Sequence, residues 1–153
     1  MDIVYLDSGV LVELLLGAES LRYNIKSSIA GRKRVTSAIS FGETLYVAIA
    51  IRAERLYGNR SRSSIRKFVR DRHEDYIILY ESIKDLYSSL DVAIVSHPKL
   101  EDLRRLIRKY TLLPRDLIHI TTALENSCTH FLTLDGNFKQ IAEQEQISII
   151  FVE

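Results

Sequence analysis

The sequence has 153 residues, of which 46% are hydrophobic and 27% charged, values typical of one ordinary globular domain with one hydrophobic core. Its formal net charge of +1 excludes binding to nucleic acid through overall positive charge. We expect no secretion leader at the start, and no apolar segment reaches the about 20 residues needed to cross a membrane. The only cysteine, Cys128, excludes an internal disulfide. We therefore expect a soluble, cytoplasmic protein that forms a single domain over residues 1–153.

The first half of the chain alternates short apolar runs with amphipathic stretches. Residues 3–6 form an apolar run that predicts a strand, and the amphipathic stretch 8–16 predicts a helix. A second helix is expected over residues 20–30, ended by Gly31, before a short strand over residues 34–37. Apolar residues at helical spacing predict a long helix over residues 39–56 that ends near Gly58, followed by a helix over residues 63–72.

The second half continues the alternation. A helix is expected over residues 82–90, and residues 92–95 predict a buried strand that His97 and Pro98 close. Helices follow over residues 100–109 and 114–125, and strands over residues 131–134 and 147–152. Strands separated by helices predict an α/β fold, with a central parallel sheet flanked by helices in a three-layer domain.

Four acidic residues lie where a strand or loop leads into an expected helix: Asp7, Glu43, Asp116 and Asp135. The carboxyl ends of parallel strands meet at one edge of a sheet, where ligands bind. Several carboxylates in one cleft repel each other unless a cation is present. Oxygen ligands without cysteine or histidine suit Mg²⁺ or Mn²⁺. We therefore expect these acids to be the metal ligands and the catalytic residues of a phosphodiester hydrolase.

Each acid also has a local structural explanation. Asp7 could cap the helix that follows it, and Asp116 could favour the positive end of a helix dipole. Ser40 and Glu43 match a capping box, and Asp135 fits a turn. Taken singly these explanations remain open, but four acids on one edge favour the metal site.

A basic stretch lies in the middle of the chain, between Arg52 and Arg72. It holds eight arginine or lysine residues against only Glu54 and Asp71. The stretch could be a solvated helix face, or a rim that contacts the phosphates of a nucleic acid through bidentate hydrogen bonds. The candidates for this contact are Arg60, Arg62, Arg66, Lys67 and Arg70.

Four ordered motifs, spread over nearly the whole chain, carry a family resemblance. They are Val-Tyr-Leu-Asp-Ser at residues 4–8, Ser-Phe-Gly-Glu-Thr-Leu-Tyr at 40–46, Asp-x-x-His-x-x-x-Ala at 116–123 and Leu-Thr-x-Asp-x-x-Phe at 132–138. Together they resemble the PIN-domain ribonucleases, and among these the VapC-type toxins of toxin–antitoxin pairs. The resemblance implies a Rossmann-like sheet, Mg²⁺- or Mn²⁺-dependent endoribonuclease activity on an RNA substrate, a homodimer, and inhibition by a cognate antitoxin that covers the acidic groove.

Individual residues carry over from the resemblance by motif position. Asp7, Glu43, Asp116 and Asp135 match the metal-binding acids of the family. Two hydroxyl residues, Ser8 and Thr133, match positions that hold the site or orient water, although local capping explains them equally well. For His119, one turn after Asp116, a packed and hydrogen-bonded histidine is favoured over a general base. The chain departs from the family in its Arg-rich middle and at Ser127, where many relatives have glycine.

Other protein classes fit the sequence less well. The segment after the first strand lacks the glycine pattern of dinucleotide-binding enzymes, and no Gly-Lys-Ser/Thr occurs for a phosphate-loop NTPase. A haloacid-dehalogenase-like phosphatase requires a second aspartate where the chain has Gly9. The remaining alternative is a catalytically silent PIN-like module that binds RNA or a partner, which gains nothing from clustered negative charge.

Overall fold

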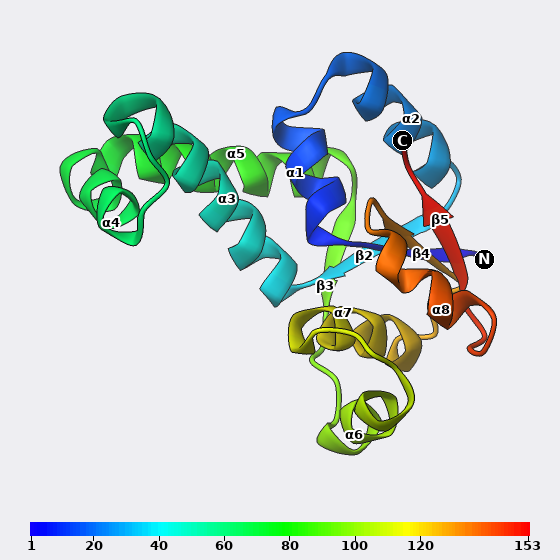
Figure 1. Cartoon of the computed structure of the whole chain (residues 1–153). Coiled ribbons are helices and arrows are strands. Elements are labelled where there is room, and N and C mark those ends of the chain that lie inside the picture. Colours follow the sequence, from blue (N-terminus) through cyan, green and yellow to red (C-terminus); the bar gives the residue numbers. More distant parts are fainter.

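The computed structural model describes residues 1–153 and centres on a five-stranded parallel sheet in the order β3-β2-β1-β4-β5 (Figure 1). The strands are β1 (Ile3–Leu6), β2 (Lys33–Ser37), β3 (Val92–Val95), β4 (His130–Thr133) and β5 (Ser148–Phe151). Tyr5 in β1 is in register with Val35 of β2 and Phe131 of β4. Because β1 is central and covered on both faces, its sequence is a continuous apolar run. The expected α/β class with a central parallel sheet is confirmed.

Eight α-helices and one short 3-10 helix connect the strands. They are α1 (Ser8–Leu16), α2 (Glu19–Ile29), α3 (Ala38–Tyr57), α4 (Arg62–Asp71), α5 (His73–Ser89), α6 (Leu100–Lys109), α7 (Pro114–Glu125), α8 (Lys139–Ala142) and the 3-10 helix η1 (Gly136–Phe138). Helix α3 ends at Gly58, whose φ of 81° is a left-handed conformation that glycine adopts without strain. None of the helices combines the length and apolar character that a membrane span requires.

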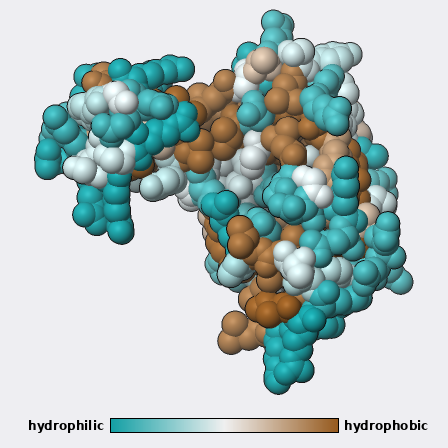
Figure 2. Space-filling view, viewed as in Figure 1, coloured by the Kyte–Doolittle hydropathy of each residue, from teal (hydrophilic) through white to brown (hydrophobic).

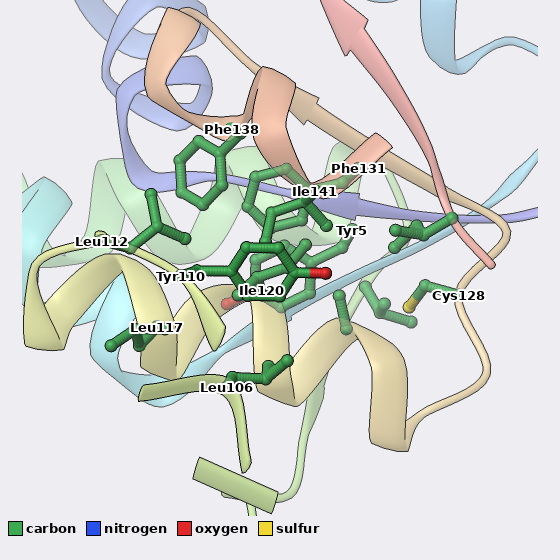
Figure 3. Packing of buried hydrophobic residues seen from close by; sticks show 13 residues of the cluster. Tyr5, Leu106, Tyr110, Leu112, Leu117, Ile120, Cys128, Phe131, Phe138 and Ile141 are labelled. Atoms are coloured by element: carbon green, nitrogen blue, oxygen red, sulfur yellow. The ribbon is translucent and has the colours of Figure 1, made fainter. Parts of the chain in front are cut away.

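The two faces of the sheet have separate apolar cores because successive side chains of a strand point to opposite faces. Tyr5 packs with Leu106, Ile120 and other residues of α6, α7 and α8 (Figure 3). Val4 and Leu6 pack on the other face, in a cluster with residues of α1, α2 and α5. Helices therefore cover both faces of the sheet, in three layers.

A third apolar cluster lies in an arm formed by residues 48–79. The distal part of α3, with α4 and the first part of α5, projects away from the sheet (Figure 1). Ala53, Phe68 and Leu79 are buried in this arm. Most of the arm's visible surface is hydrophilic (Figure 2). The arm thus has its own small core and presents charged residues to solvent.

Two elements differ from the expectations, whereas the others begin and end within one residue of them. Helix α5 begins at His73, not near residue 82, because buried Leu79, Ile83 and Tyr87 continue a helical stripe towards an acidic first turn. Strand β3 is not buried: it is an edge strand, and Ile94 is 53% exposed. The short helices over residues 136–142 have no counterpart in the expected elements.

Candidate functional site

The strand order places the four candidate acids along the carboxyl edge of the sheet. Asp7 directly follows β1, and Asp135 lies two residues beyond β4. Glu43 lies in the second turn of α3, the helix that follows β2, and Asp116 lies in the first turn of α7. Strands β2, β1 and β4 are neighbours in the sheet. Residues far apart in the chain therefore meet at one edge.

Asp7 is a buried carboxylate without an ion-pair partner. Its side chain is 9% exposed. Oδ1 accepts a hydrogen bond from the Ser8 backbone N–H at 2.8 Å, and Oδ2 accepts one from the Thr133 hydroxyl at 2.7 Å. Burial raises the pKa of Asp7, although nearby His119 and these two hydrogen bonds oppose the rise. Asp7 is the N-cap of α1, but its second oxygen has a partner outside the helix, so capping explains only half of its contacts.

Thr133 connects two of the acids. Its fully buried hydroxyl donates to Asp7 and accepts a hydrogen bond from the backbone N–H of Asp135 at 3.0 Å. The Asp135 carboxylate accepts from the Asn137 backbone N–H at 2.9 Å, which is the turn that the sequence suggested for this residue. Thr133 thus fixes the positions of both acidic segments.

Glu43 does not form the expected capping box. Ser37 is the N-cap of α3, and its hydroxyl accepts from the Ser40 backbone N–H at 3.2 Å. The Glu43 carboxylate points instead to α7, where Oε2 lies 3.2 Å from Nε2 of His119 and Oε1 lies 3.4 Å from Nε of Arg115. The capping-box interpretation is wrong because Ser37 begins the helix three residues earlier than Ser40 would.

The electrostatic surroundings of Glu43 favour its charged form. Burial alone would raise the pKa of Glu43, but the contacts with His119 and Ser8 and the charge of Arg115 outweigh burial and lower the pKa. Oε1 is shielded from solvent and has no hydrogen-bond partner. Glu43 is therefore favoured as a charged carboxylate, and its Oε1 has the Arg115 ion pair but no hydrogen bond.

His119 links Glu43 to the core of the sheet. Its side chain is 1% exposed, so the expectation of a packed, hydrogen-bonded histidine is confirmed, although its partners are Glu43 and Tyr5 and not Asp116. Because a carboxylate can only accept, Nε2 donates to Glu43. Nδ1 lies 2.8 Å from the Tyr5 hydroxyl oxygen and, in the neutral ring, accepts a hydrogen bond from it. Burial raises the pKa of Tyr5 to about 12, which keeps this donor protonated.

Tyr5 and Arg115 are site residues that the sequence reasoning missed. A tyrosine within an aliphatic central strand is a signal, because a buried hydroxyl needs a hydrogen-bond partner. Arg115 stands next to Asp116 in the sequence, but only the packing of α7 against α3 reveals its contact with Glu43.

Asp116 has no hydrogen bond or ion pair to its half-buried carboxylate. Burial raises the pKa of Asp116, and the charges of Asp135 and Asp7 raise it further. These three carboxylates therefore share one region of negative potential. However, no group of three or more histidine, cysteine, aspartate or glutamate side chains is arranged closely enough to hold a metal ion. The acids line the edge as hard oxygen donors that suit Mg²⁺ or Mn²⁺, but they do not form a ready-made cage.

Three arginines of α4 lie on the side of the helix that faces away from the rest of the arm. Arg62, Arg66 and Arg70 recur at four-residue spacing and so share one side of α4, which we call the outer α4 face. All three are exposed, whereas Phe68 packs inward. Arg70 pairs with Asp71 at 2.6 Å. Arg62 and Arg66 have no carboxylate partner and are free to bind an anion.

The two remaining candidates for nucleic-acid contact already have neighbours. Arg60 pairs with Glu54 at 2.6 Å, and the Lys67 ammonium lies 4.7 Å from the centre of the Tyr57 ring. Both side chains remain exposed. These contacts are weak at a solvent-exposed surface, so an anionic partner could replace them.

Comparison with known families matches residues 4–144 to the PIN domain. The chain belongs to the PIN domain family. No curated protein matched the sequence. PIN domains are generally nucleases, and the family together with the fold supports an enzyme of the nuclease kind that acts on nucleic acid.

Proposed function

We propose that this PIN-domain protein is a Mg²⁺- or Mn²⁺-dependent endoribonuclease, in which Asp7, Glu43, Asp116 and Asp135 hold the cation and form the catalytic centre. The observation that carries this proposal is the buried Asp7 carboxylate. Two hydrogen-bond donors hold it, but no lysine or arginine side chain pairs with it, and Asp116 close by also has a raised pKa. A protein that keeps unpaired carboxylates together at a sheet edge loses stability unless a cation is bound.

The other residues of the site hold these acids in place. Thr133 and the Ser8 backbone orient Asp7, and the chain from Tyr5 through His119 orients Glu43. When bound, a divalent ion would neutralise the acids, lower the pKa of an attacking water and stabilise the leaving oxygen of the phosphodiester. None of the four acids then needs to act as a proton donor.

The RNA strand would enter beside Glu43. A groove there is lined by residues that include Tyr46, Val47 and Arg115. Tyr46 is 54% exposed, so its ring can stack on a base of any identity, and Arg115 can bind a phosphate. The outer α4 face would contact the backbone further along the strand.

A narrower assignment, to the VapC-type toxins, rests on the four sequence motifs. This assignment implies that the protein forms a homodimer and that a cognate antitoxin blocks the acidic groove. Expression of the chain alone should arrest bacterial growth, and co-expression with a small protein encoded beside its gene should restore growth. Unimpaired growth on expression of active nuclease would contradict the toxin assignment.

RNA cleavage by the purified protein, freed of any partner, tests the nuclease proposal. We expect cleavage with Mg²⁺ or Mn²⁺ that stops on addition of EDTA. The Asp7→Asn and Asp116→Asn proteins should lose cleavage by at least 100-fold, a loss of about 2.7 kcal/mol of transition-state stabilisation. The matched control is Asp85→Asn, which changes an exposed aspartate of α5 without an ion-pair partner. Undiminished cleavage by either site variant would overturn the mechanism. Wild-type protein that binds RNA without cleaving it in any cation would favour the silent binding module.

A further inference from the structure

A cavity with a basic rim lies in the arm, between α3, α4 and α5. Its volume is about 190 Å³, which is below the roughly 300–1,000 Å³ of sites that enclose a whole small molecule, so part of a ligand would lie outside it. Arg52, Arg55 and Arg72 stand around it. The proposed nuclease mechanism assigns no role to this cavity.

The rim carries an excess of positive charge. Arg52 and Arg55 are three residues apart on α3 and so lie on the same side of the helix. Both are exposed and neither pairs with a carboxylate. Arg72 donates from Nε to Oδ2 of Asp75 at 2.7 Å, which holds the Arg72 guanidinium in place. Three guanidinium groups therefore face one carboxylate, and two of them are free to bind an anion.

The wall of the cavity is apolar. Leu56 lies one turn after Arg52, Phe68 is contributed by α4, and Leu79 by α5. Exposed Ile78 also lines the cavity. Free guanidinium groups beside an apolar wall suit a ligand with an anionic group at one end and a flat, weakly polar body at the other.

The cavity is separate from the acidic edge. Arg52 follows Glu43 by nine residues on the same helix, which is about two and a half turns and about 14 Å along its axis. Because this separation is two full turns plus half a turn, the side chains of Glu43 and Arg52 lie on opposite sides of α3. A ligand in the cavity would therefore not touch the carboxylates.

We propose that this cavity binds a nucleoside monophosphate group, with the phosphate between Arg52 and Arg55 and the base against the exposed side chains of Leu56 and Ile78. The group could be a free nucleotide or one nucleotide of an RNA chain. Binding at this site goes beyond the proposed nuclease function and does not require a divalent cation.

Titration of the whole protein with adenosine monophosphate in EDTA tests this proposal. We expect saturable binding by calorimetry, with resonances of Leu56 and Ile78 shifting in the NMR spectrum. Joint substitution Arg52→Ala and Arg55→Ala should weaken binding at least 10-fold. The matched control is joint substitution of Arg104→Ala and Arg108→Ala, two exposed arginines of α6 without ion-pair partners, and it should leave binding unchanged. We call this pair the α6 control.

The apolar wall is tested with smaller probes. Ribose 5-phosphate and inorganic phosphate should bind at least fivefold more weakly than adenosine monophosphate, because they lack the base. Displacement of the nucleotide by a short RNA would show that the site binds one nucleotide of an RNA chain. A lack of displacement would show that the site binds the free nucleotide. Either result supports the proposal. Equal binding by the double variant and the wild type, or by phosphate and the nucleotide, would overturn it. EDTA prevents metal-dependent cleavage, so the two proposals fail or stand independently.

Discussion

Substitution of Thr133 by valine should destabilise the protein through the charge on Asp7. Valine has nearly the shape of threonine, but it removes the hydroxyl that donates to Asp7 at 2.7 Å and accepts from Asp135 at 3.0 Å. Thr133 is fully buried, so water does not replace the hydroxyl. A hydrogen bond to a charged group contributes about 1.5–3 kcal/mol. For a chain of this length the loss corresponds to a fall in Tm of roughly 3–12 °C.

The assay is urea unfolding followed by circular dichroism, in EDTA and near neutral pH. Thr133→Ser is the matched control, because it keeps the hydroxyl and loses only a methyl group, at a cost of about 1 kcal/mol. In the Asp7→Asn background the bond is no longer charge-assisted, so the valine substitution should cost only about 0.5–1.5 kcal/mol. A Thr133→Val protein as stable as the wild type, or an equal cost in both backgrounds, would refute the role assigned to this hydroxyl.

Three further predictions concern pH, a helix end and the arm. In EDTA the free energy of unfolding should fall as the pH rises through the raised pKa values of Asp7 and Asp116, because the folded protein holds these protons more tightly than the unfolded chain. Urea unfolding measured across pH should show this fall, and the Asp7→Asn substitution should make it smaller. Ser127 has a φ of 55° at the end of α7, so Ser127→Gly should raise the free energy of unfolding by about 0.5–1 kcal/mol. The control Ser88→Gly, within α5, should lower the free energy of unfolding by a similar amount. A destabilised Ser127→Gly protein would contradict this explanation. Replacing the three arginines of the outer α4 face by glutamate should weaken RNA binding and reduce the slope of log Kd against log salt by about two. The α6 control should change neither the RNA affinity nor this slope. Unchanged affinity and slope in the glutamate variant would show that this face is only a solvated surface.

Sequence patterns predicted the sheet and the position of the acids because both depend on local signals. Apolar runs that alternate with amphipathic stretches define the strands and helices, and any residue that follows a parallel strand lies at the carboxyl edge. The amino-acid order alone therefore suffices to assign Asp7 and Asp135 to that edge. Glycine at position 127, which the family resemblance led us to expect, would also have a physical reason in the fold, since Ser127 lies in the left-handed region.

Contacts between helices could not be predicted in the same way. The sequence suggested that Glu43 closes a capping box, because that motif is local, whereas its partners His119 and Arg115 come from a helix about 75 residues away. The link from Tyr5 to His119 also depends on how α7 packs against the sheet. Similarly, helix spacing shows which residues share a side of α3 or α4, but it does not show that these helices leave the sheet as an arm.

Binding of Mn²⁺ to the metal-free protein, measured by calorimetry, tests the central claim most directly. If the carboxylates along the sheet edge form the cation site, wild-type protein should bind Mn²⁺ and gain thermal stability from it. Asp7→Asn and Asp116→Asn should each weaken binding at least 10-fold, and Asp85→Asn should bind like the wild type. Equal Mn²⁺ affinity in the wild type and both site variants would contradict the claim.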